Sequence, residues 1–110
     1  MTSLLDQPGR PARSLATLAH IGPNTLALVG AREFAHSDER GLVTFQVDGA
    51  GGRMVCRMNV QLGGADEYEV ESGYIDPSTW QWTVHERAES INVGQLSETV
   101  ERLADRMWDL

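Results

Sequence analysis

The most telling absence in this chain of 110 residues is lysine, because all nine of its basic residues are arginine. Without lysine there can be no Walker-type phosphate loop, no Schiff-base chemistry and no lysine general base. The single cysteine, Cys56, excludes an internal disulfide and is expected to be a buried thiol. No apolar run is long enough for a signal peptide or a membrane span, so we expect a cytoplasmic protein with no membrane partner.

The charge balance is acidic, with 16 aspartate and glutamate residues and a formal net charge of -7. Direct binding to DNA or RNA depends on clustered positive charge, so this balance argues against it. It fits a basic partner, a DNA-mimicking role or simple solubility. The length fits a single domain, which we place at residues 14–110. Residues 1–13 are expected to form a flexible arm, because Pro8, Gly9 and Pro11 interrupt regular structure.

Two strands with strict alternation are predicted at residues 53–62 and 67–75, joined by a turn at 63–66. Period-two alternation buries one face of each strand and exposes the other, as in a half-solvated antiparallel hairpin. The exposed side of the second strand carries Glu67, Glu69 and Glu71, and Asp66 lies in the turn before them. This acidic row is the candidate surface for a partner.

Three further strands are predicted at residues 25–30, 42–47 and 80–87, which gives an antiparallel meander of four to five strands. In the last strand, Trp80, Trp82 and Val84 are expected to face the core. Residues 31–41 are expected to form a polar connection that Phe34 anchors.

The C-terminal segment 95–108 predicts an amphipathic helix with Leu96, Val100, Leu103 and Met107 on one stripe. A shorter helix is expected to begin at Ser14, where Leu15, Leu18 and Ile21 share a face, and to end at Gly22. Because the long helix needs an apolar surface to cover, an α+β fold with this helix packed on one face of the sheet follows.

Matching inward positions with inward positions predicts the register of the exposed face. The result is two cross-strand rows, Arg57–Glu71–His85 and Asn59–Glu69–Arg87. Such a lattice serves either a structural role or a partner-binding face. In both cases Glu67, beside Asp66, is left as the carboxylate most available to a partner.

No pattern indicates catalysis, a metal or a cofactor, so we expect a protein that is not an enzyme. Successive outward carboxylates on a strand lie roughly 6.8 Å apart, too far to clamp one small cation. Glu71 beside His85 would lie on an open sheet face without a pocket. Residues 36–39 include a serine, a histidine and acidic residues, the residue types of a catalytic triad. A turn capped by side-chain hydrogen bonds to the backbone is the better interpretation of these residues.

Trp108 has a different setting from the other tryptophans, because it lies at the end of the last helix beside Met107. Together with Leu110 it is expected to form an apolar tip suited to docking or self-association. An unpaired edge strand offers a second route to a homodimer.

A series of short motifs runs through residues 14–103. They are Leu18, Ile21-Gly22, Asn24, Ala27, Gly30-Ala31, Phe34, Ser37-Asp38, Gly41-Leu42, Phe45, Val60, Leu62, Asp66, Tyr68, Val70-Glu71, Gly73, Leu96 and Leu103. In this order they resemble a family of small uncharacterised proteins encoded by phages and prophages. That family has no assigned activity, so the resemblance implies a genome context and not a chemistry. The Trp80-Gln81-Trp82 stretch departs from it.

Two function classes follow. The first is a small acidic non-catalytic interaction protein of phage or mobile-element origin that binds another protein, in one version as an acidic decoy for host nucleic-acid-binding machinery. The second is a structural or assembly accessory that acts as a homo-oligomer. The candidate partner-binding residues are Asp66, Glu67, Glu69, Glu71 and Trp108.

Overall fold

The computed structural model describes residues 13–50, 52–63 and 65–110 of the chain. The elements are α1 (Arg13–Ile21), α2 (Pro23–Leu28), β1 (Arg32–Ser37), β2 (Leu42–Gln46), β3 (Val55–Leu62), β4 (Tyr68–Asp76), β5 (Gln81–Ile91), α3 (Val93–Arg106) and a 3-10 turn η2 (Met107–Asp109). The sheet is antiparallel and its strands lie in the order β1-β2-β3-β4-β5. The predicted α+β meander with a C-terminal helix and a short N-terminal helix is therefore confirmed. The predicted arm lies outside the described residues, except that Arg13 begins α1.

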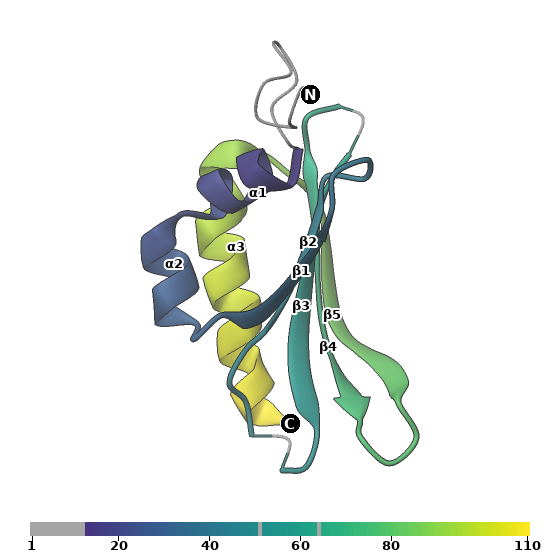
Figure 1. Ribbon diagram of the computed structural model, residues 1–110. Helices are drawn as coiled ribbons and strands as arrows, with labels where there is room; N and C mark the ends of the chain where they lie inside the picture. The colour runs from purple at the N-terminus through teal and green to yellow at the C-terminus, as the bar shows by residue number, and fades with distance from the viewer. Residues whose placement is uncertain (1–12, 51, 64) are drawn as a thin grey trace.

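The molecule has two layers, with all three helices on one side of the sheet (Figure 1). The predicted stripe of α3, Leu96, Val100, Leu103 and Met107, is fully buried against the helix-facing side chains of the strands, which include Met58 and Val70. The side chain of Asn92 caps α3 by accepting a hydrogen bond from the amide of Gln95 at 3.1 Å. No helix of the described residues covers the other face of the sheet, which we call the open face.

The first helix is rotated from its predicted orientation, so that only part of the predicted face is buried. Ile21 is fully buried and Leu18 packs against the core, whereas Leu15 is exposed. The hydroxyl groups of Ser14 and Thr17 take the buried positions instead, because both find hydrogen-bond acceptors in the β1–β2 turn. Thr17, for example, donates to the carbonyl of Gly41 at 3.1 Å.

The predicted strand at 25–30 is wrong, because this segment forms most of α2. Proline at the first helical position presets the helical φ angle, and α2 follows Gly22 directly. The buried hydroxyl of Thr25 donates to the Glu101 carboxylate on α3 at 2.7 Å, which ties the two helices together. Gly30 ends the segment with a φ of 67°.

The predicted polar connection at 31–41 is also wrong, because it contains the edge strand β1. Five of the six residues of β1 are exposed, so no alternation in hydrophobicity marks it as a strand. Phe34 does act as an anchor, since its ring centroid lies 5.7 Å from that of the buried Phe45.

The expected inward positions of β5 are wrong as well. Trp82 pairs with Ile75 and Val84 pairs with Gly73, and both of these β4 residues lie on the open face. The predicted row that sets Glu71 opposite His85 also sets Tyr74 opposite Trp82, whereas Tyr74 pairs with Thr83. A shift of one residue moves every side chain to the other face of the sheet. A bulge at His85 restores the expected facing from Glu86 onward. Trp80 lies in the β4–β5 turn and is 75% exposed.

Candidate functional site

The open face divides along the strands into a polar half and an apolar half. We define the polar half as Asn59, Gln61, Glu67, Glu69, Glu71, Arg87 and Glu89, near the β3–β4 turn. The apolar half consists of Val55, Ile75, Trp82 and Val84, near the β4–β5 turn. Along β3, the members of both sets alternate with the buried row of Cys56, Met58 and Val60, so they point to the open face. The members on the other strands lie across from these residues and share their face.

In the polar half, a single arginine links the acidic side chains. The Arg87 guanidinium lies 2.7 Å from the carboxylate of Glu69 and 3.1 Å from that of Glu89. The hydrogen bond to Glu69 raises the pKa of Arg87. Glu71, which pairs with Arg87 across the strands, accepts a hydrogen bond from the neutral amide of Asn59 at 3.2 Å.

The predicted cross-strand rows are displaced by two residues. Asn59 pairs with Glu71 and Arg57 pairs with Gly73, because the chain between the paired Leu62 and Tyr68 takes a longer path than the predicted turn. Each side chain still points to its predicted face of the sheet, because a shift of two residues preserves the alternation of side chains. The predicted contact between Glu69 and Arg87 is confirmed.

The predicted contact between Arg57 and Glu71 is wrong. Arg57 turns toward the β1 edge, where it donates to the carbonyl of Glu33 at 2.8 Å and to the hydroxyl of Thr44 at 3.0 Å. The predicted contact of His85 with Glu71 is wrong too, because His85 is the additional residue of the bulge.

Asp66 and Glu67 lie in the β3–β4 turn, and both are exposed. The carboxylate of Glu67 forms no hydrogen bond or ion pair with the residues that the structure describes. A shallow hollow of about 340 Å³ lies beside this turn, with Glu67, Glu69 and Glu89 on its wall.

The apolar half is centred on a glycine. The Trp82 ring lies so close to Gly73 that a Cβ added there would be 2.6 Å from its Cη2 atom. Val84 is 47% exposed on the same face. The sequence shows these side chains as apolar and in a strand, and only their placement on the outer face was missed.

The turn next to the apolar half holds Trp80 in an uncommon backbone conformation, with a φ of 58°. The carboxylate of Asp76 fixes this turn by accepting hydrogen bonds from the amide and the hydroxyl of Ser78, at 2.9 and 2.7 Å. These bonds lower the pKa of Asp76. The amide of Trp80 also donates to the carbonyl of Asp76 at 2.6 Å.

Trp108 does not share a surface with the acidic residues. It is 56% exposed in η2, beside the buried Met107, with Leu110 also exposed. The C-terminus and the β3–β4 turn lie at opposite ends of the molecule (Figure 1). The candidate residues therefore separate into an acidic group on the open face and a single tryptophan on the helix layer.

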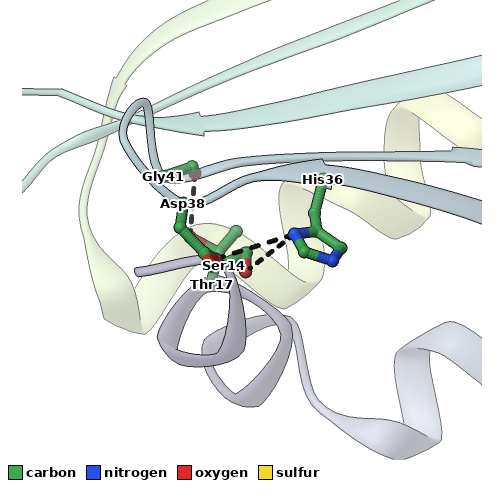
Figure 2. Close-up of polar contacts among 5 residues, drawn as sticks. All are labelled: Ser14, Thr17, His36, Asp38 and Gly41. Atoms are coloured by element: carbon green, nitrogen blue, oxygen red, sulfur yellow. Dashed lines mark hydrogen bonds and ion pairs between the residues drawn. The ribbon is translucent and has the colours of Figure 1, made fainter. Parts of the chain in front are cut away.

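A second polar cluster brings together Ser14 of α1 with His36 and Asp38 of the β1–β2 hairpin (Figure 2). The Ser14 hydroxyl donates to Asp38 and lies 3.4 Å from Nδ1 of His36, and the same nitrogen lies 3.6 Å from Asp38. A catalytic relay needs serine and aspartate on different ring nitrogens. Ser14 is also only 3% exposed, so the cluster fastens α1 to the hairpin. The sequence placed Ser14 at the start of the first helix, but its contacts with His36 and Asp38 join residues 22 and 24 positions apart, and no local pattern predicts them.

Comparison with known proteins finds no matching family model, no matching curated protein and no matching solved structure. Within residues 13–50, 52–63 and 65–110, no helix is long and apolar enough to cross a membrane. The same residues contain no group of three or more histidine, cysteine, aspartate or glutamate side chains arranged to hold a metal ion.

Proposed function

We propose that this protein is a small, acidic, non-catalytic binding protein that holds another protein on its open face. The apolar half carries this proposal, because it gathers four apolar side chains on a sheet face that no described helix covers. Val84 is exposed and the other three side chains are half-buried. Apolar side chains gathered on an uncovered face of a small domain are typical of interaction sites, and tryptophan is enriched among the residues that dominate binding energy.

The polar half suits the edge of such an interface. Protein interfaces combine an apolar centre with a polar rim that sets orientation and excludes mismatched partners. The carboxylates of Glu67, Glu69 and Glu71 then favour a partner with positive charge. A cytoplasmic phage or mobile-element protein that occupies the nucleic-acid site of a host protein is the specific form of this proposal. The sequence resemblance supports the phage origin alone, and the acidic face supports the basic nucleic-acid site as its target.

Self-association is the second candidate function, and the exposed Trp108 favours it. Pairing through sheet edges is disfavoured, because both edge strands are irregular. Glu33 in β1 and Ser90 in β5 have φ angles of 53° and 57°, and the register shifts next to each of them. Bulges of this kind prevent a second strand from pairing along the edge. A homodimer would therefore use the helix layer near Trp108.

The chain offers a matched pair of variants to test the proposal. Val84 on the open face and Val93 at the start of α3 are 47% and 46% exposed. We expect Val84→Arg to abolish capture of the host partner in quantitative affinity purification, whereas Val93→Arg leaves capture unchanged. Equal recovery of the same partner by both variants would place binding elsewhere. Trp108→Ala, followed by sedimentation velocity, tests the homodimer in parallel.

A further inference from the structure

We infer that the open face is arranged for an extended basic segment of a partner protein, with an apolar anchor on the apolar half and arginine or lysine on the polar half. This inference rests on the proposed function and names the chemistry of the partner. Its basis is the order of side chains along β4, where Glu69, Glu71, Gly73 and Ile75 follow one another on the same face.

The spacing of these side chains sets the spacing required in the partner. Alternate residues of a strand are roughly 6.8 Å apart, so Ile75 lies about 14 Å from Glu71 and about 20 Å from Glu69 along the strand. An extended segment spans these distances in about four and six residues, whereas a helix would need about nine and thirteen. The partner should therefore carry its basic side chains four to six residues from its anchor.

The charges of the polar half are not balanced within the protein. Arg87 is already shared between Glu69 and Glu89, and Arg57 points toward β1. Glu71 accepts a hydrogen bond from the neutral amide of Asn59 and interacts electrostatically with Arg87, whereas Glu67 has no ion-pair partner among the described residues. One guanidinium therefore faces four carboxylates, and the excess negative charge of the polar half attracts cationic side chains of a partner.

The apolar half supplies a hydrophobic contact surface, which an acidic cluster alone does not provide. The ring of Trp82 packs against Gly73, beside Ile75 and Val84 on the same face, and this apolar surface can contact an aromatic or branched aliphatic anchor. Nucleic acid would place its phosphates against the carboxylates of the same face. A second copy of this chain would bring the same carboxylates and so would leave the excess negative charge of the polar half unneutralised.

The test uses the full chain and a display library of random peptides about twelve residues long, which extend to about 40 Å. We expect the enriched peptides to combine an apolar or aromatic residue with arginine or lysine four to six positions away. A synthetic peptide of this design, titrated by fluorescence anisotropy, should bind at least tenfold more tightly than a scrambled peptide of equal composition. Its affinity should fall as salt concentration rises.

Variants separate this inference from the proposed function. Glu69→Gln and Glu71→Gln should each weaken the designed peptide about three- to fivefold, while Glu98→Gln on the exposed side of α3 should not. Val84→Arg should abolish binding and Val93→Arg should not. Enriched peptides without basic residues, or with basic residues at helical spacing, would overturn the partner chemistry and leave the proposed function standing. If no peptide distinguishes the wild type from Val84→Arg, both are wrong.

Discussion

The indole ring of Trp82 lies over Gly73 of the neighbouring strand, on the face of the sheet that carries no helix in the described chain. A Cβ at position 73 would approach the Cη2 and Cζ2 atoms of the ring to 2.6 and 2.7 Å and would also meet the carbonyl oxygen of Thr83. The glycine therefore allows two features at once: a tight β4–β5 pairing and the close packing of the Trp82 ring against the neighbouring strand.

We predict that Gly73→Ala destabilises the fold by about 1–3 kcal/mol, because the added methyl group displaces both the ring and the backbone. Urea denaturation followed by tryptophan fluorescence measures this change. Gly94→Ala is the control, since its Cβ would meet only the Asn92 side chain at 3.3 Å. If Gly73→Ala unfolds at the same urea concentration as the control, the close packing of Trp82 on Gly73 is wrong.

We predict that Trp80→Gly stabilises the protein by about 1 kcal/mol, because glycine adopts a positive φ without strain and the exposed indole contributes little burial. Thermal unfolding should shift upward by about 4 °C. Trp80→Ala removes the same indole and keeps the strained backbone, so it should show no such gain. Equal melting temperatures for the two variants would contradict the backbone explanation.

The buried hydroxyl of Ser14 leads to a third prediction. Ser14→Ala removes the hydrogen bond to Asp38 and should cost about 1–3 kcal/mol, because the carboxylate loses a donor beside the start of α1. Ser78→Ala is a suitable comparison, since that hydroxyl is exposed and should cost less. Hydrogen exchange of the α1 amides measures the effect locally, and unchanged protection in Ser14→Ala would show that the bond does not hold the helix.

The β4–β5 turn predicts a pH dependence. The hydrogen bonds from Ser78 hold the pKa of Asp76 below its ordinary value. A carboxyl whose pKa is depressed in the folded state stabilises the fold above the ordinary carboxyl pKa, and this contribution is lost as the pH falls through the folded pKa. Carboxyl-detected NMR titration should find the low pKa of Asp76 in the wild type and a higher one in Ser78→Ala. An identical pKa in both proteins would rule out this cause.

The elements that the sequence predicts well are those with a regular burial pattern. Alternation in β3 and β4 and the apolar stripe of α3 follow directly from one side facing a shared core, so their residues alone define them. Glu69 and Glu71 were placed on the correct face for the same reason.

The predictions are wrong where the burial pattern is weak or where a contact between residues distant in the sequence determines the local structure. β1 is almost entirely exposed, so only its pairing with β2 makes it a strand. α2 has six residues, and its hydrogen bond from Thr25 to Glu101 joins segments far apart in the sequence. The facing of Trp82 depends on the exact length of the β4–β5 turn, and hydrophobicity alone suggested the opposite side.

The irregular edges of the sheet have a consequence for the behaviour of the protein at high concentration. A chain with exposed apolar side chains on a β-sheet is at risk of growing into fibrils, since each unpaired edge can template the next strand. Here Glu33 and Ser90 interrupt both edges. Association is thereby confined to the apolar half of the open face. A partner bound there completes the contact and does not expose a new edge for the next chain.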